Sequence, residues 1–385
     1  MLTPLHGQCK TPGGKLVAVE VRVAGGLLDG VRVRGDFFLH PEAATAATLD
    51  AIAAALNGQP AALEVGALAA HVRAAIPFGV ELLGTTPEAI AVAVRRAVTG
   101  DADADPVAPA DHIGRFTTAE IARFTAGWAD YPWRVLPERP LSPALNVALD
   151  EVLTDRLSKG LVPPTLRFWR WSDPAVIIGR TQSVANEVDL DAAAARGVTV
   201  VRRMTGGGAM FLQPHGAITY SLYLPEAALA GFTIRASYEV CEAWVIKALR
   251  GLGVDAHHVP INDIACSEGK IGGAAQARRG GVVLHHTTMA YDMDPGEMVQ
   301  VLRIGREKLK GKATASAAKR VSPLVRQTGL SREAIVEGLR AGFVARFGGT
   351  PGVLATKGGK TLVLQCKKYS ANVGNSAVQE AVSAQ

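Results

Sequence analysis

The sequence predicts a mixed α/β protein that folds in two parts, and three observations support this. The chain has 385 residues, 48% of them apolar, which is enough to bury the cores of two or three domains. Helical periodicity alternates along it with short alternating strands and glycine-rich turns. A small, acidic, proline-containing segment over 101–109 predicts a linker.

Charge divides at the same place as the linker. Residues 1–110 hold 8 basic and 11 acidic side chains, a net charge of −3, whereas residues 111–385 hold 33 and 24, a net charge of +9. The most basic stretch, 303–326, has eight lysines and arginines against one glutamate. Such a stretch is either a solvated basic face or a surface that attracts a polyanion, an acidic protein as well as a nucleic acid. No RNA-binding motif or zinc finger accompanies it, so nucleic acid is not expected.

Residues 1–105 are predicted to form a small α+β domain. Lys15–Val23 carries valines at alternate positions, the pattern of a half-buried strand, and Val31–Arg34 continues the alternation after a glycine-rich turn. Helices are expected from Pro41 to about Asn57 and from Thr86 to Gly100. The second has an N-cap threonine, a proline in its first turn and a glycine at its end.

After a linker over 106–125, residues 126–369 are predicted to form the second domain, followed by a flexible tail over 370–385. Helices are expected after Ser142, over Ala236–Leu252 and from Ser331 to Phe347. Strands are expected at five further places: Leu166–Trp171, Ala175–Ile178, Val198–Val201, Ile218–Leu224 and Val282–Tyr291.

Several protein classes are excluded by the sequence. No apolar run approaches the roughly 20 residues that span a bilayer, so no membrane association is expected. The N-terminus lacks a basic head followed by an apolar stretch, which predicts a cytoplasmic protein. The four cysteines (Cys9, Cys241, Cys266 and Cys366) form neither a zinc pattern nor a dense disulfide framework, which favours reduced thiols.

The strongest chemical signal is Arg202-Arg203-Met204-Thr205-Gly206-Gly207-Gly208-Ala209. Successive glycines leave backbone N–H groups unobstructed, so that they can converge on an anion beside the arginine charge. Because strands are expected on both sides, the loop matches neither a Walker A loop nor a Rossmann turn. Alone it could also be a plain turn.

A second glycine-rich segment, Gly269 to Gln276, contains Lys270, which could reach a phosphate. Asp263 lies seven residues upstream and could hold Mg²⁺. Cys266 is a possible nucleophile, although no neighbouring residue in the sequence argues for an activated thiol. His257-His258 is expected at the surface, and the rings of His285-His286 are expected on opposite faces of a strand. Two anion-suited loops in one domain favour a site over two accidental turns.

These motifs resemble those of lipoate–protein ligases in the biotin/lipoate ligase superfamily. The order of the segments 202–209, 219–221 (Thr-Tyr-Ser), 262–264 (Asn-Asp-Ile), 269–276 and 285–288 (His-His-Thr-Thr) is similar to that family over about 130–345. Residues 10–100 resemble the family's accessory domain, here fused at the N-terminus. The resemblance implies a catalytic domain with a mixed, largely antiparallel sheet plus a small α+β accessory domain.

The resemblance also implies an activity. Members of the family activate lipoate or octanoate with ATP and Mg²⁺ to an acyl-adenylate and acylate a lysine of a lipoyl carrier domain, of the 2-oxoacid dehydrogenase E2 type or the glycine-cleavage H type. Lys270 would be the catalytic residue and Asp263 the metal ligand. The adenylate would bind to a set of residues around both loops: Arg203, Gly206, Gly207, Gly208, Ala209, Met210, Phe211, Lys270, Gly273 and Ala274.

Two alternatives stay open beside the ATP-dependent ligase. Thr-Tyr-Ser and Cys266 are closer to octanoyl and lipoyl transferases of the same superfamily, which use a cysteine and need no ATP. Gly208, where those enzymes typically carry arginine, and the accessory domain favour the ligase. The other alternative is a non-catalytic carrier-binding protein, which predicts loss of the lysine or the glycines, and both are present.

Overall fold

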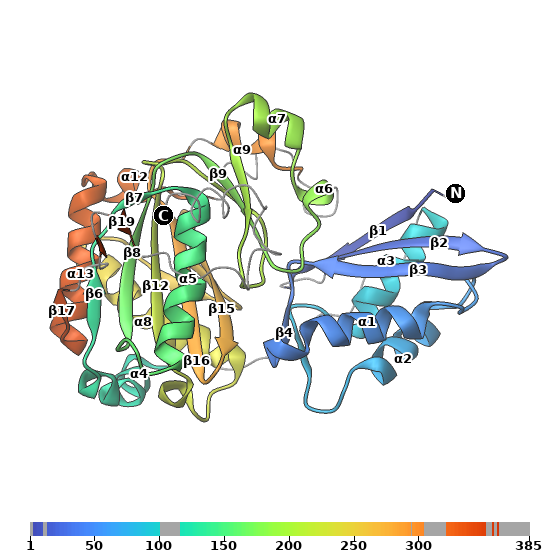
Figure 1. Ribbon diagram of the computed structural model, residues 1–385, viewed down its shortest axis with the longest axis horizontal. Coiled ribbons are helices and arrows are strands. Elements are labelled where there is room, and N and C mark those ends of the chain that lie inside the picture. The colour runs from blue at the N-terminus through green and yellow to red at the C-terminus, as the bar shows by residue number, and fades with distance from the viewer. Residues whose placement is uncertain are drawn as a thin grey trace.

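The structure is a computed structural model that describes residues 3–10, 14–100, 116–293, 295–303, 321–351, 356–357 and 360–361. It contains a small N-terminal domain beside a larger second domain (Figure 1). The expected linker residues 106–115, the expected tail 370–385, Cys366 and most of the basic stretch, 304–320, lie outside the described residues.

The N-terminal domain is a three-stranded antiparallel sheet with helices packed on one face (Figure 1). Its sheet is formed by β1 (Leu5–Lys10), β2 (Leu16–Ala24) and β3 (Leu27–Gly35), and its helices are η1 (Glu42–Ala44), α1 (Thr45–Leu56), α2 (Val65–Ala75) and α3 (Pro87–Thr99). A short pair, β4 (Phe38–His40) with β5 (Glu81–Leu83), completes it. The Thr86 side chain caps α3 and Gly100 ends it in a left-handed conformation, as the sequence predicts.

The second domain is built on a nine-stranded, largely antiparallel sheet. Its path runs through β13 (His257–Val259), β14 (Asp263–Cys266), β15 (Gly269–Arg279), β16 (Val282–Ala290), β12 (Ala217–Pro225), β8 (Thr165–Trp171), β6 (Arg134–Leu136) and β17 (Thr350–Pro351), with β7 (Pro140–Leu141) also pairing with β8. The pairings of β6, β7 and β17 are parallel and the others antiparallel.

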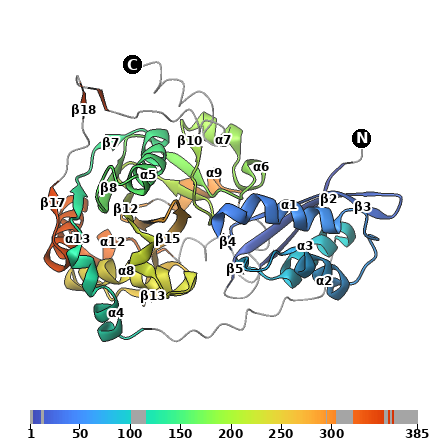
Figure 2. The ribbon, with the colours of Figure 1, turned by 60° about the horizontal axis from the view of Figure 1, so that its bottom comes forward.

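A smaller sheet stands beside the large one (Figure 2). One apolar core lies between the two sheets, and a second covers the opposite face of the large sheet. It contains β9 (Ala175–Ile178), β10 (Thr199–Arg202) and β11 (Met210–Leu212), flanked by α6 (Val184–Glu187), α7 (Leu190–Ala195) and α9 (Pro295–Val301). Helix α5 (Pro143–Ser158) packs between the sheets against Trp169 and Ile177. On the other face of the large sheet, Phe168 packs in a core formed with α8 (Ile234–Gly251) and α13 (Arg332–Phe347).

The remaining described elements are short. They are α4 (Thr118–Phe124), η2 (Ala126–Asp130), η3 (Glu226–Leu229), α12 (Leu324–Thr328) and the two-residue strands β18 (Thr356–Lys357) and β19 (Lys360–Thr361). Helix α4 falls within the expected linker 106–125, yet the Phe124 ring lies 4.9 Å from the Phe232 ring of the second domain. The second domain therefore begins before residue 126.

The fold class expected from the sequence is confirmed. The mixed α/β architecture with a largely antiparallel sheet and a small α+β domain is present, and the expected helices lie within a few residues of α1, α3, α5, α8 and α13. Within the part of the chain that the structure describes, no helix has both the length and the apolar character that a membrane crossing requires.

Candidate functional site

The triple-glycine loop joins β10 to β11 and is held in shape by Arg203. The guanidinium group donates four hydrogen bonds within its own surroundings: to Thr205 Oγ1 at 2.9 Å, Ile177 O at 3.1 Å, Gly206 O at 2.7 Å and Gly208 O at 3.0 Å. Burial lowers the Arg203 pKa to about 10, so the side chain remains charged at neutral pH. Arg203 therefore fixes the loop carbonyls, in addition to lining the site that the loop forms.

The glycines of this loop are required by close contacts and by backbone conformation. A Cβ atom at Gly206 would lie 2.7 Å from Cδ1 of Phe38, which comes from the N-terminal domain. Gly207 adopts a φ of +92°, which side chains other than glycine rarely allow. Among the described residues, the N–H groups of Gly207 and Gly208 donate to no backbone carbonyl. These two N–H groups are thus available to an anionic oxygen.

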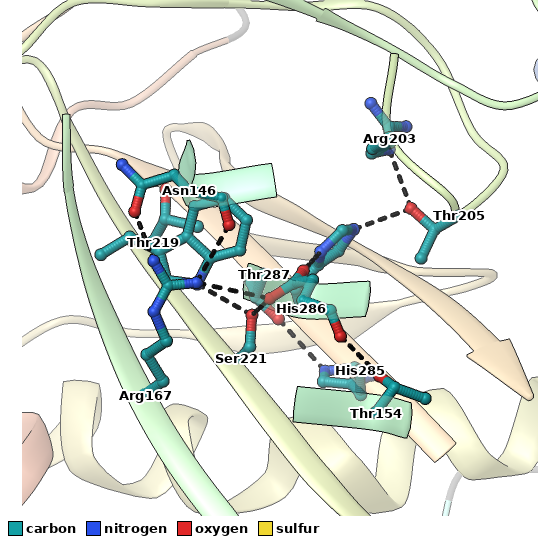
Figure 3. A network of polar contacts seen from close by, with 12 residues as sticks. Asn146, Thr154, Arg167, Arg203, Thr205, Thr219, Ser221, His285, His286 and Thr287 are labelled. Carbon is teal, nitrogen blue, oxygen red and sulfur yellow. Dashed lines mark hydrogen bonds and ion pairs between the residues drawn. The ribbon is translucent and has the colours of Figure 1, made fainter. Parts of the chain in front are cut away.

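A series of buried, hydrogen-bonded side chains connects the glycine loop to the large sheet (Figure 3). Thr205 Oγ1 lies 2.8 Å from His286 Nε2, and His286 Nδ1 lies 2.7 Å from Asp150 Oδ2 on α5. Asp150 also accepts hydrogen bonds from Ser221 Oγ at 2.9 Å and from the Tyr223 hydroxyl. This arrangement fits an imidazole that donates from Nδ1 to the carboxylate and accepts from Thr205 at Nε2.

The lysine segment forms the other wall of the site. Lys270 lies at the start of β15, and its Nζ donates to Asp263 Oδ1 on β14 at 2.7 Å. The Lys270 side chain is 45% exposed and the Asp263 side chain 30% exposed. Burial opposes ionisation of Asp263, but the ammonium groups of Lys270 and Lys15 outweigh this effect and lower the carboxyl pKa. Lys270 therefore presents a charge that can move toward a ligand.

The two walls enclose a cavity of about 230 Å³. Its lining combines the glycine loop and strand β15, where the sequence predicts a second loop, with two residues of the N-terminal domain. The lining residues are Lys15, Asp36, Arg203, Gly207, Gly208, Ala209, Met210, Asn262, Lys270, Gly273, Ala274, Ala275, His286 and Thr288. The structure thus brings to one place eight of the ten residues that the resemblance assigned to the adenylate. The exceptions are Gly206, which lies under Phe38, and Phe211, whose ring is buried in a separate apolar cluster beside Val176.

Cys266 and Asp263 occupy less favourable positions for the roles that the sequence suggested. Cys266 is 7% exposed, packs in the core on the far face of the large sheet, and donates to Gly269 O at 3.5 Å. It is not among the described residues that line the cavity. The Asp263 carboxylate faces two ammonium groups, and the described residues contain no cluster of three or more potential metal ligands. This donor set does not fit Mg²⁺, which prefers several oxygen ligands.

Some polar residues were missed or misplaced by sequence reasoning. His258 is not at the surface: it is 7% exposed, and its Nδ1 lies 2.5 Å from Glu242 Oε2. Asp150, which accepts hydrogen bonds from several buried side chains, was not singled out from the sequence. The signal that could have found it is the run Asn146, Asp150 and Glu151 in a helix whose other residues are mostly apolar. The rings of His285 and His286 do face different partners, Gln276 and Asp150.

Comparison with known families matches residues 142–346 to the lipoyl protein ligase A/B catalytic domain. The chain belongs to this family. The expected resemblance is therefore confirmed, and the N-terminal domain lies outside the matched segment. Within the family, the chain is similar to octanoyltransferases LipM. That of Kyrpidia tusciae is 31% identical over 271 residues, which cover 63% of this chain and 98% of the relative.

Two further relatives extend the comparison. The octanoyltransferase LipM of Symbiobacterium thermophilum is 34% identical over 194 residues, covering 45% of this chain and 70% of the relative. A solved structure from an archaeal lipoylation system, a bi-partite lipoate protein ligase and its E2 lipoyl domain from Thermoplasma acidophilum, is 30% identical with a TM-score of 0.53. It covers 60% of this chain and 89% of the solved chain, and it shares the catalytic fold.

The curated relatives correct one expectation from the sequence. The family resemblance implied an ATP-dependent lipoate–protein ligase, but the curated members that the chain resembles over most of their length are octanoyltransferases. The ligase prediction is therefore wrong, and ATP as a substrate loses its support. Gly208 and the accessory-like domain were the two features that had favoured the ligase over the transferase. The coarser expectation holds: the chain belongs to a family of enzymes that modify proteins in lipoylation.

Proposed function

We propose that this chain is an octanoyl or lipoyl transferase, which moves the acyl group from a thioester donor to a lysine amine of a lipoyl carrier domain. The donor would be an acyl group on an acyl carrier protein, by analogy with the octanoyltransferase relatives. An E2-type lipoyl domain or a glycine-cleavage H-type protein is the proposed acceptor, and the cytoplasm is the proposed compartment. The observation that carries the proposal is that Gly207, Gly208 and Lys270 line one cavity.

Acyl transfer to an amine needs what this cavity offers. The neutral acceptor amine attacks the carbonyl carbon, the carbonyl oxygen becomes negative, and the N–C bond forms. Collapse of this intermediate breaks the C–S bond, and the leaving thiolate takes the proton that the amine releases. The N–H groups of Gly207 and Gly208 and the ammonium of Lys270 are the donors available for the negative oxygen. Arg203, Thr205 and His286 hold the glycine loop in place for this task.

The alternative to direct transfer is a covalent route, in which the Cys266 thiol carries the acyl group. Transferases of this superfamily use a cysteine, and Cys266 pairs with Gly269 at the start of the lysine strand. A covalent route would require its thiol to leave the core cluster that it now occupies. The geometry therefore favours direct transfer between thioester and amine. We expect Cys266→Ser to retain most of the transfer rate, measured by mass spectrometry of the carrier domain. Loss of transfer in a folded variant would assign the acyl-carrying role to this thiol.

The proposed function is tested with the purified full-length chain and a lipoyl domain. One reaction contains octanoyl-loaded acyl carrier protein without ATP, and a second contains free octanoate or lipoate with ATP and Mg²⁺. We expect the lipoyl domain to gain one octanoyl group in the first reaction, and a lipoyl domain whose acceptor lysine is replaced by arginine to gain none. Acylation only in the second reaction would contradict the transferase, and binding of the carrier without acylation in either would favour a non-catalytic protein.

A further inference from the structure

The N-terminal domain is joined to the catalytic domain by a built interface. Thr181 Oγ1 donates to Gly35 O at 2.8 Å, and the Gly35 N–H donates to Thr181 O at 3.3 Å. Glu42 forms an ion pair with Arg180 and accepts from the Arg278 N–H at 3.1 Å. Apolar side chains of both domains share one cluster: Phe38, Leu83, Ile234, Tyr238, Ile261, Ala274 and Ala275. This interface fixes the N-terminal residues that face the cavity.

Lys15 is directed into the cavity by its surroundings. It stands immediately before β2, and its N–H donates to Gly84 O at 2.6 Å. Gly84, with a φ of +84°, leaves room for the lysine stem: a Cβ atom there would lie 2.5 Å from Lys15 Cγ and 3.3 Å from Ile261 Cδ1. The stem therefore passes between its own domain and the catalytic domain.

At the end of this path the ammonium group meets the residues of the lysine segment. Lys15 Nζ donates to Asn262 Oδ1 at 2.6 Å and lies over the Phe38 ring, 5.8 Å from its centroid. Four charged residues surround it: Asp36, Asp263, Lys270 and, more weakly, Lys10. Burial is the main cause that lowers the Lys15 pKa; Lys270 adds to it, whereas Asp263 and Asp36 oppose it. Burying an amine beside a second lysine costs free energy, and a contact that only joined the two domains would not require that cost.

We propose that Lys15 belongs to the acyl-transfer site, where its side-chain nitrogen supplies a second positive donor next to Lys270 for the negative oxygen formed during transfer. The catalytic domain alone would then be an incomplete enzyme, because one of its two lysine donors comes from the N-terminal domain. This inference rests on the proposed function and adds a residue outside the family-matched segment to its machinery. Stabilisation of this kind acts on the transition state, and therefore on kcat.

The test compares Lys15→Met with Lys15→Arg in the full-length chain. Methionine keeps the stem and removes the charge, so we expect kcat to fall by about 100-fold with little change in the KM for the carrier domain. Arginine keeps the charge, so we expect the kcat of Lys15→Arg to be at least about tenfold higher than that of Lys15→Met. The radius of gyration from X-ray scattering reports whether the two domains stay together, and it should not change in either variant.

Arg22→Met is the matched control, since it removes an exposed charge of the same domain, paired with Asp29 near the turn between β2 and β3. That turn points away from the catalytic domain (Figure 1). The control variant should transfer at the normal rate. Normal kcat in Lys15→Met would overturn the inference while leaving the proposed function intact. Equal losses in both Lys15 variants with a larger radius of gyration would also overturn it, because Lys15 would then only join the domains. Absence of transfer by the unchanged chain would contradict the proposed function and this inference together.

Discussion

The glycine loop and the lysine segment face the same cavity but are held in opposite ways. The loop is fixed by buried groups: Arg203 is 5% exposed, Thr205 fully buried, and His286 joins them to Asp150. Lys270, in contrast, is nearly half exposed and has one carboxylate partner. A fixed set of N–H donors stabilises charge without reorganising, whereas an exposed ammonium group can follow the substrate. Substitutions in the two regions should therefore have different effects on folding and on rate.

The largest expected effect is on the buried side, at Asp150. Asp150→Ala leaves Ser221, Tyr223 and His286 without their shared acceptor, and Arg167, 3.6 Å away, without its nearest carboxylate. We expect the free energy of unfolding to fall by about 3–5 kcal/mol, because buried partners are left unpaired. Chemical denaturation followed by tryptophan fluorescence measures this loss.

The matched control, Asp155, lies further along the same helix. Asp155 forms an exposed ion pair with Lys159 at 2.7 Å, so Asp155→Ala should cost only about 0.5 kcal/mol. Similar losses of stability in the two variants would show that the buried hydrogen bonds of Asp150 matter no more for folding than a surface ion pair. The glycine loop would then not be held more firmly than the lysine segment.

On the lysine side, activity should change while stability does not. Lys270→Met removes the ammonium group, and we expect kcat for acyl transfer to fall by about 10²–10³-fold. Because Lys270 is half exposed, the free energy of unfolding should change by less than about 1 kcal/mol. Carrier acylation and denaturation are measured on the same samples, with Lys159→Met as the control. A Lys270→Met variant that transfers at the normal rate would remove this residue from the proposed mechanism.

The smallest expected effect concerns Glu151, beside Asp150 on α5. It is 5% exposed, and one of its carboxylate oxygens has no hydrogen-bond partner among the described residues. Burial raises the Glu151 pKa to about 7; Arg279 opposes the shift and Asp150 adds to it. Between about pH 4.5 and 7 the unfolded chain loses this proton while the folded chain keeps it, so stability falls as pH rises.

Glu151→Gln should therefore stabilise the protein above pH 7, by at most about 3 kcal/mol, and leave its stability unchanged near pH 4. Denaturation at both pH values measures the difference. Glu337→Gln is the control, because a hydrogen bond from Arg340 lowers the Glu337 pKa and no gain is expected there. A gain for Glu151→Gln that is the same at both pH values would point to packing rather than to ionisation.

The sequence was sufficient for the longer helices α1, α3, α5, α8 and α13 and for the glycine loop, but not for every element or for the contacts between elements. The glycine-rich segment 269–276 was expected as a loop and is part of strand β15. Local signals such as the Thr86 cap and the alternating valines of β2 depend on neighbouring residues, so they were visible. The Asp150–His286 contact joins residues far apart in the chain and depends on how α5 packs on the large sheet. Cys266 lies on the same face of β14 as Ile264, but whether that face meets the core or the cavity depends on how the sheet packs against α8, which no local pattern indicated.

The contact between Phe38 and Gly206 has a consequence for how such proteins change over time. Because the ring occupies the space where a side chain at position 206 would stand, a larger residue at 206 requires a smaller one at 38. The two positions are thus expected to vary as a pair, although they belong to different domains. Where the domains are encoded as separate chains, that pairing would have to be inherited jointly by two genes.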